Sequence, residues 1–286
     1  MINNGIRNEY IYVNYLNRKT VGELNPLMQD LIYKIFNNIN EKDLIYAKRN
    51  PGKEKADIII TIGKQKRNIS LKIGDKNSVH LEPISEFIHF LIENNLPRQA
   101  IIKYLEFQYA DGTRNGTGTN RLSVEEYKKT NQEDINYLNE QFKNKKFIDK
   151  CIERFILKGR EKNFKKIDAI VTGKICDFFY ITEQEIKEII YKYIDIETTG
   201  LHIGPLFIQP QSRNLNYNKK YETCRYNVQI KWFNLSDQIL LYKNDLVMKQ
   251  KNTQDISKLW LKYHKKTLKS FWNMKNIIQS KLLSKR

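Results

Sequence analysis

The sequence predicts an α/β protein whose C-terminal part is largely helical. Two runs of apolar, β-branched residues on either side of a short basic turn, within 57–73, predict a β-hairpin. Apolar residues at helical spacing predict one helix before this hairpin, over 21–37, and another after it, within 77–92. The 286 residues can bury a sizeable core and contain no evident linker, so we expect a single domain over 1–286.

Local signals support these elements in chain order. Thr20 and Glu23 have the spacing of a capping box at the start of the first helix. Pro83 suits the first turn of the second helix, and the segment 101–109 predicts a further strand. The remaining expected elements are a loop over 111–121, helices over 123–157, strands over 167–172 and 176–181, a helix over 182–195, a loop over 200–218 and a strand over 226–232.

The end of the chain predicts a long amphipathic helix over 255–283. Its apolar residues, including Trp260 and Phe271, share one stripe. A second stripe on a different face consists of Lys258, Lys262, Lys265 and Lys269. Two interpretations stay open, because this lysine face is either solvated or lies along a phosphate backbone.

The net charge points to a polyanionic partner. The chain has 50 basic and 32 acidic side chains, a formal charge of +18. From Lys249 to Arg286 there are eleven basic residues and one acid, Asp255. Lysine and arginine gain affinity by displacing counterions from nucleic acid, so we expect double-stranded DNA as partner. Solubility and an AT-rich source are the alternative explanations of the basic composition.

Several classes of protein are excluded by what the sequence lacks. Cys151, Cys176 and Cys224 are far apart, and they form neither a zinc ligand set nor an even disulfide framework. No apolar run approaches the length of a membrane span, and no cleavable signal sequence is recognisable. No phosphate-binding GxxxxGK[ST] loop is present, so we expect no nucleotide cofactor. These observations favour a cytoplasmic protein.

An acid and a lysine stand at the ends of the two hairpin strands. Asp57 opens the first strand and Lys72 closes the second, so the antiparallel pairing places both at one edge of the sheet. A divalent metal that cleaves phosphodiesters needs carboxylate oxygens, and a lysine can orient the attacking water or offset charge at phosphorus. The hairpin therefore predicts a phosphodiester-cleaving site, with a plain surface hairpin as the alternative.

These residues resemble the PD-(D/E)xK signature of restriction-endonuclease-like nucleases. The pattern is Lys55-Ala56-Asp57, then twelve residues, then Ser70-Leu71-Lys72, and the helices on both sides of the hairpin follow the family's order. The resemblance covers roughly 20–110 and implies a core with a mixed central sheet flanked by helices. Ala56 replaces the usual proline, and Ser70 replaces the usual second acid.

The family resemblance implies a second carboxylate that Ser70 cannot supply. Some members of the family with serine there recruit a glutamate from the following helix, and the candidates here are Glu82 and Glu86. Glu82 is slightly favoured, although it would also suit a helix N-terminus, and Glu86 would also suit a solvated helix face. Glu23 resembles the acid of the family's first helix, with the capping box as the alternative.

By this resemblance, Asp57 and a glutamate hold Mg²⁺ and Lys72 positions the water. We expect a type II restriction endonuclease that leaves 5′-phosphate ends and acts as a homodimer, because a palindromic site matches a two-fold axis. Two alternatives are a non-catalytic DNA-binding protein, which Ser70 favours, and a structure-specific repair or recombination nuclease.

Reading a DNA sequence needs side chains that contact bases, since phosphate contacts carry no sequence information. Gln and Asn can pair with adenine and Arg with guanine, so the polar loops and the strand after them are candidates, with flexible surface loops as the alternative. The expected DNA-contacting residues outside the last helix are Arg114, Asn115, Asn120, Arg121, Gln209, Gln211, Arg213, Asn214, Arg225, Gln229 and Lys231.

Overall fold

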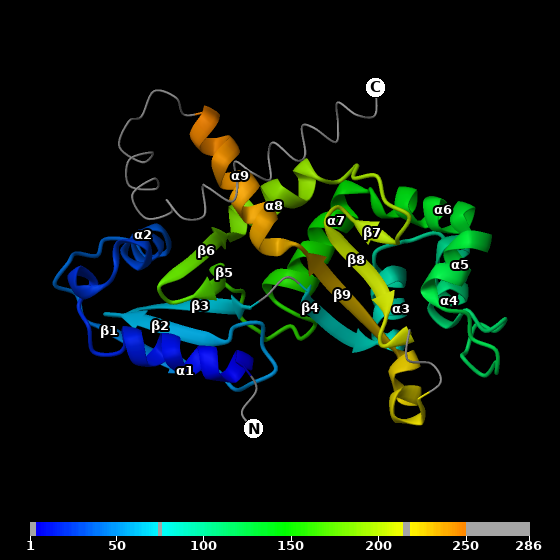
Figure 1. Ribbon diagram of the computed structural model, residues 1–286, viewed down its shortest axis with the longest axis horizontal. Coiled ribbons are helices and arrows are strands. Elements are labelled where there is room, and N and C mark those ends of the chain that lie inside the picture. Colours follow the sequence, from blue (N-terminus) through cyan, green and yellow to red (C-terminus); the bar gives the residue numbers. More distant parts are fainter. Residues whose placement is uncertain (1–3, 74–75, 214–217, 250–286) are drawn as a thin grey trace. The chain divides into compact units, whose positions relative to one another are not determined.

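The computed structural model describes residues 4–73, 76–213 and 218–249. Residues Met1–Ile239 form one compact unit, and Leu240–Arg286 form a second. The first unit contains both β-sheets (Figure 1). The expected helix over 255–283, with its lysine stripe Lys258, Lys262, Lys265 and Lys269, lies outside the described residues. A single domain over 1–286 stays a prediction.

The first sheet has five strands and contains the predicted hairpin. Its single parallel contact joins β3 to β5, and the other neighbours are antiparallel, so the sheet is mixed. Gly63, with a φ of 55°, opens the short turn between β2 and β3, a conformation that glycine adopts without strain. The strands in spatial order are β1 (Ile45–Arg49), β2 (Ile58–Ile62), β3 (Gln65–Lys72), β5 (Ala169–Lys174) and β6 (Asp177–Thr182).

Helices α1 (Asn4–Leu16) and α2 (Pro26–Ile35) cover one face of this sheet (Figure 1). Their buried side chains, such as Leu16 and Met28, share one core with Ile58, Ile60 and other inward residues of the strands. Asn25 caps α2 by accepting from Met28 N at 2.8 Å, and Pro26 occupies its first turn. Burial of this apolar surface fixes the hairpin against the helices.

The parallel pairing of β3 and β5 requires a long crossover connection. This connection contributes one strand of the second sheet and several helices. It begins with strand β4 (Lys76–Pro83) and continues through a run of helices. These helices are α3 (Ile84–Glu93), α4 (Arg98–Tyr109), α5 (Val124–Thr130), α6 (Gln132–Phe142), α7 (Lys145–Cys151) and the π-helical segment η2 (Ile152–Leu157).

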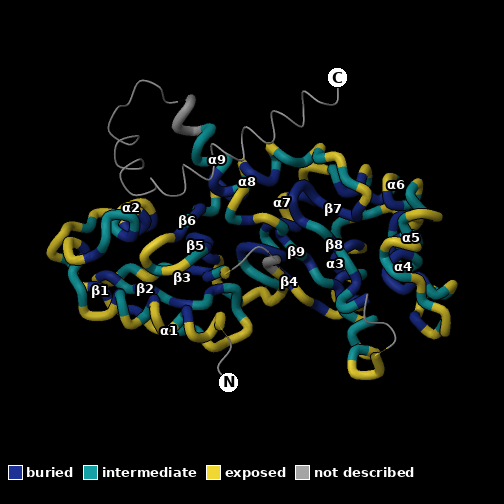
Figure 2. The backbone as a smooth tube through the Cα atoms, viewed as in Figure 1, coloured by how far each residue is buried: buried dark blue, intermediate teal, exposed yellow. Residues whose placement is uncertain are grey.

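The second sheet has four strands in the order β4-β9-β8-β7, all antiparallel. Helix α8 (Glu183–Lys192) follows β6, and the chain then adds the remaining strands beside β4. Figure 2 shows that the strand centres are mostly buried, whereas the exposed segments lie mainly in connections and on outer helix faces. The later elements are β7 (His202–Ile203), β8 (Leu206–Pro210), the 3-10 helix η4 (Lys219–Tyr226), β9 (Asn227–Phe233) and α9 (Leu235–Lys249).

Four sequence predictions about elements were wrong. The helix expected over 21–37 is divided into the 3-10 helix η1 (Val21–Glu23) and α2, because Leu24 is extended and Asn25 caps a new helix. Residues 101–109 belong to helix α4, because Tyr104 and Phe107 are buried at helical spacing. Residues 77–83 are strand β4, and the helix begins only after Pro83. The segment 200–218 contains β7 and β8 and is not a loop throughout. Within the described residues, no helix is long and apolar enough to span a membrane.

Candidate active site

A cavity of about 880 Å³ opens between the hairpin end of the five-stranded sheet and strand β4. Asp57 and Lys72 contribute its floor from the first sheet, and Ser78 and Glu82 contribute from β4. Residues after η2, within 159–164, supply a further wall. The cavity therefore brings together the two ends of the predicted hairpin and the strand that follows it.

Asp57 is held in place by the strand beside it. Its Oδ2 accepts a hydrogen bond from Leu71 N at 2.6 Å and another from Ser70 Oγ at 3.1 Å. Lys72 Nζ lies 3.6 Å from the same oxygen. Among the described residues, none donates to the other oxygen, Oδ1. The predicted convergence of acid and lysine is thus present, with one carboxylate oxygen left for a ligand.

Ser70, which stands where a second acid is usual, supports Asp57 directly. Its side chain is buried in the central strand β3, and its hydroxyl is a donor to the carboxylate. A buried carboxylate at this position would instead place two like charges together. Ser70 therefore acts in this geometry as an orienting hydrogen-bond donor.

Glu82 lies on β4 and is closed off from solvent. Arg154, from the π-helical segment, donates to its carboxylate from Nε at 3.1 Å and from a terminal nitrogen at 2.6 Å. The Glu82 side chain is 0% exposed. Both of these hydrogen bonds end on Oε2, and Nε also donates to Oε1 at 3.4 Å, so the guanidinium balances the charge of the carboxylate.

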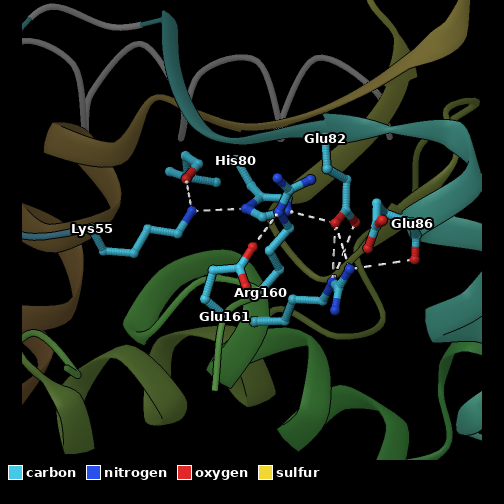
Figure 3. Close-up of polar contacts among 8 residues, drawn as sticks. Lys55, His80, Glu82, Glu86, Arg160 and Glu161 are labelled. Carbon is cyan, nitrogen blue, oxygen red and sulfur yellow. Dashed lines mark hydrogen bonds and ion pairs between the residues drawn. The ribbon is translucent and has the colours of Figure 1, made fainter. Parts of the chain in front are cut away.

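A lysine and a histidine extend the Glu82 pair toward the hairpin (Figure 3). Lys55 Nζ donates to Val79 O at 2.6 Å and lies 2.9 Å from His80 Nδ1. His80 Nε2 lies 3.2 Å from Glu82 Oε2, in a contact that falls short of hydrogen-bond geometry. With Nδ1 accepting from Lys55, a neutral imidazole carries its proton on Nε2, the nitrogen that faces Glu82.

Burial dominates the protonation equilibria of this cluster. Burial lowers the pKa of His80 to about 4, despite the opposing effect of Glu82. Burial, followed by the charge of Lys72, lowers the pKa of Lys55 to about 7. Burial alone would raise the pKa of Glu82, but its contacts with His80 and Arg154 outweigh this and hold that pKa below its usual range.

The two other acids predicted as metal ligands lie elsewhere. Glu86 is exposed in the first turn of α3, where only its backbone carbonyl contacts Arg154, at 3.3 Å. Glu23 is exposed and accepts from Thr20 N at 2.6 Å and from the Thr20 hydroxyl at 2.9 Å. Those hydrogen bonds lower the pKa of Glu23, as expected for a capping residue.

The residues present fit a magnesium ion only in its sparsely ligated form. Within the described part of the chain, no three His, Cys, Asp or Glu side chains lie close enough together to hold a metal ion. Mg²⁺ commonly takes one or two carboxylates and completes its shell with waters and substrate phosphate. Asp57 lines the cavity, and the contacts that it makes with Ser70, Leu71 and Lys72 all go to Oδ2, so this carboxylate suits that donor set.

The predicted DNA-contacting residues separate into exposed and structural groups. Gln209, Gln229 and Lys231 lie on the half-exposed face of the four-stranded sheet. Arg213 is 2% exposed and donates to the backbone carbonyls of Leu122 and Phe107, so its guanidinium holds the loop to helix α4. In this structure that guanidinium cannot reach a base.

The loop over 111–121 is tied down from two sides. Arg121 donates to the carbonyls of Tyr109 and Gln108, and Arg225 donates to the carbonyl of Gly116 at 2.8 Å. Arg114 is exposed and pairs with Glu106 at 2.7 Å. Three further predicted contacts are Asn115 and Asn120, which are exposed, and Asn214, which lies outside the described residues.

Three features of the cavity were not found from the sequence. Lys55 and Arg154 bind partners far away in the chain, and no local pattern announces those contacts. The segment 158–166 does carry a signal, since it contains five basic residues and is exposed over most of its length. Gly159 allows it to turn with a φ of 94°, beside Lys55 and Phe164.

Comparison with known proteins shows the fold. No protein-family model and no curated protein matches the sequence. Among solved structures, the chain is similar to the restriction endonuclease MspI in complex with its cognate DNA, with a TM-score of 0.51 and 13% identity. The similarity covers 78% of this chain and 87% of that one. The predicted fold class, a restriction-endonuclease-like α/β core with a mixed sheet flanked by helices, is thereby confirmed.

Proposed function

We propose that the protein is a metal-dependent endonuclease that hydrolyses phosphodiesters in double-stranded DNA. The observation that carries the proposal is the meeting of Asp57, Ser70 and Lys72 at one sheet edge inside an open cavity. The fold supports it, since the similar restriction endonuclease structure contains its cognate DNA. The charge of +18 suits the same polyanionic substrate.

Asp57 would hold Mg²⁺, with DNA phosphate and water completing the coordination shell. The bound ion would stabilise negative charge at the phosphoryl group. Ser70 and the Leu71 amide, both on β3, hold the Asp57 carboxylate through Oδ2. Its other oxygen, Oδ1, would then bind the ion. Lys72 would orient the attacking water and offset charge in the transition state, and in-line attack would leave a 5′-phosphate and a 3′-hydroxyl.

In this proposal Glu82 is a structural acid and not a metal ligand. To bind a metal, its carboxylate would have to leave Arg154, which would leave a partly buried guanidinium without its partner. Glu86 and Glu23 likewise remain outside the proposed centre. The basic segment 158–166, part of which forms the 159–164 wall, would contact the phosphate backbone beside the cleaved bond.

We further propose type II restriction activity, meaning cleavage at a specific site, by a homodimer. A two-fold axis would present two copies of the cavity to a palindromic duplex. Sedimentation of the protein with a duplex that it cuts would give two chains per duplex. One chain per duplex would contradict the dimer and leave the chemistry unaffected.

A non-catalytic DNA-binding protein is the second candidate. Ser70 in place of an acid favours it, as does the lack of a three-ligand cluster among the described residues. Under that alternative, the protein would bind duplex DNA with the same affinity in Mg²⁺ or EDTA and would leave it intact.

Cleavage of long duplex DNA tests the proposal. The wild-type protein is incubated with DNA in Mg²⁺ or EDTA beside Lys72→Met and the control Lys174→Met, an exposed lysine at the end of β5. We expect discrete fragments only with metal, and a loss of roughly 10²-fold or more in Lys72→Met alone. Binding without cutting would overturn the enzyme proposal, and a smear would favour a nuclease without site specificity.

A further inference from the structure

The outer face of the four-stranded sheet presents an ordered set of side-chain amides. Residues of β9 alternate between buried and half-exposed, which places Asn227 and Gln229 on the outer face. Gln209 and Gln211 stand beside them on β8 and just beyond its end. Four carboxamides thus form two neighbouring rows on one surface.

Each row is joined across the strands. Gln209 Nε2 donates to Gln229 Oε1 at 3.3 Å, and Gln229 Nε2 donates to Ser78 Oγ at 3.2 Å. In the next row, Asn227 Nδ2 donates to Gln211 Oε1 at 2.9 Å. Residues two apart in a strand lie about 6.8 Å apart, which is close to two base-pair rises of about 3.4 Å each.

The array is supported from beneath. Gln108, which is fully buried in α4, donates to the backbone carbonyls of Arg225 at 2.8 Å and Asn227 at 3.1 Å. Trp232 on the inner face of β9 donates to Gln238 at 2.7 Å. Side chains mounted on such fixed strands lose little further freedom when they bind a ligand.

An exposed leucine completes the first row. Leu81 on β4 pairs in register with Gln229, which itself pairs with Gln209. Its side chain is 48% exposed, beside polar neighbours. Such an aliphatic side chain suits contact with a methyl group, and thymine carries one in the major groove beside the N6 and N7 atoms of adenine.

The array is continuous with the candidate active site. Ser78, Leu81 and Asn227 line the same cavity as Asp57 and Lys72. A duplex whose backbone lies against Asp57 would therefore present base edges to this face. Carboxamides can donate to adenine N7 and accept from adenine N6 at once, a pairing that guanine and cytosine do not offer.

We propose that this sheet face reads A·T base pairs, with Gln209 and Gln229 bound to adenine and Leu81 against the methyl group of thymine. The inference rests on the proposed function for its substrate, duplex DNA. It adds that the recognition site contains adenine at a fixed position, and that methylation of adenine N6 blocks recognition.

The test separates recognition from cutting. Duplexes are selected from a random library by binding to Asp57→Asn protein, and the selection is repeated with Gln229→Ala or Gln184→Ala added. Gln184 is a matched control, an exposed glutamine on α8 that bonds Glu188 and does not line the cavity. We expect an A·T pair at a fixed position, with its enrichment reduced roughly 10- to 100-fold by Gln229→Ala and unchanged by Gln184→Ala.

N6-methyladenine at that position should reduce binding as much as Gln229→Ala does, and 5-methylcytosine elsewhere should not. A selected site of G·C pairs alone, no enriched site, or an unchanged preference in Gln229→Ala would overturn the inference. Cleavage by the wild-type protein is scored separately. Metal-dependent cutting at a G·C-only site would overturn the A·T inference alone, and an A·T site bound without cutting would overturn the proposed function alone.

Discussion

Asp57 and Glu82 are two carboxylates that line one cavity in opposite surroundings. Asp57 is 29% exposed, is oriented by Ser70 and has one lysine nitrogen 3.6 Å away. Glu82 is 0% exposed and accepts two hydrogen bonds from Arg154 at Oε2. The first carboxylate keeps an oxygen available, whereas the second is already neutralised.

The difference shows that two acids lining one cavity can differ in how far their charge is already paired within the protein. Removing one partner of a buried ion pair costs about 3–5 kcal/mol. Moving Glu82 away from Arg154 to bind a metal ion would therefore cost stability. The cation beside Asp57, Lys72, lies 3.6 Å from Oδ2, the same oxygen that Ser70 and Leu71 bind. We therefore propose that Asp57 serves the chemistry and that Glu82 serves the stability of the fold.

The largest expected effect is on cleavage by Asp57→Asn. Loss of the anionic ligand should slow cutting by at least roughly 10³-fold, about 4 kcal/mol in barrier height. Single-turnover cleavage measures this change, with Asp177→Asn, an exposed aspartate at the start of β6, as the control. Wild-type cutting by Asp57→Asn would contradict the role of Asp57.

The same comparison predicts that Arg154→Met destabilises the fold. It leaves the Glu82 carboxylate buried without its cation, so we expect a loss of about 3 kcal/mol in the free energy of unfolding. Urea denaturation measures it. The double variant Glu82→Gln/Arg154→Met should lose less than Arg154→Met alone, since no unpaired charge remains. Equal losses would show that the pair is not coupled.

A pH dependence should follow from His80. Its pKa is about 4 in the folded protein and about 6.5 when unfolded. The unfolded chain therefore takes up this proton first as the pH falls, and stability drops by up to about 1.4 kcal/mol per pH unit between pH 6.5 and 4. Urea titrations at several pH values in this range give the free energy of unfolding, and its slope against pH should be shallower in His80→Asn. An unchanged slope would contradict the burial of a neutral His80.

Glu82 should add a separate loss at lower pH. Because its pKa is held below the usual range in the folded protein, its contribution is present above about pH 4.5 and disappears as the pH falls through the folded value. In the Glu82→Gln variant, a plot of the free energy of unfolding against pH should lack this loss at low pH. Persistence of the loss in that variant would assign it to other carboxylates.

The smallest expected effect is that of Ser70→Ala. The Leu71 amide still holds the Asp57 carboxylate in this variant, so we expect only about a 10-fold fall in the cleavage rate, near 1.4 kcal/mol. The rate at saturating DNA measures it. A loss as large as that of Asp57→Asn would give Ser70 a role beyond orientation.

The sequence could predict the hairpin and its two end residues, because alternating apolar runs and a glycine turn are local signals. It could also predict that Glu23 caps a helix, as the structure shows. Strand β4 was not predicted, because the polar run over 77–82 suggested a connection leading into a helix with Pro83 in its first turn.

Long-range pairing accounts for most of what the sequence could not predict. Arg154 reaches Glu82 across 72 residues, and Lys55 reaches His80 across 25. Arg213 was predicted to read DNA because it lies in a polar loop. Its guanidinium instead donates to backbone carbonyls and lies over the rings of Phe107 and Tyr127. Residue type and spacing cannot show which charges are already satisfied by distant parts of the chain.

The magnesium dependence of cleavage by Glu82→Gln is the most direct test of the central claim. The rate is measured against Mg²⁺ concentration, at a temperature where circular dichroism shows the variant folded. If Asp57 holds the metal and Glu82 is structural, the Mg²⁺ concentration at half-maximal rate will match that of the wild type. A tenfold or greater rise, with folding intact, would contradict the claim and return Glu82 to the metal site.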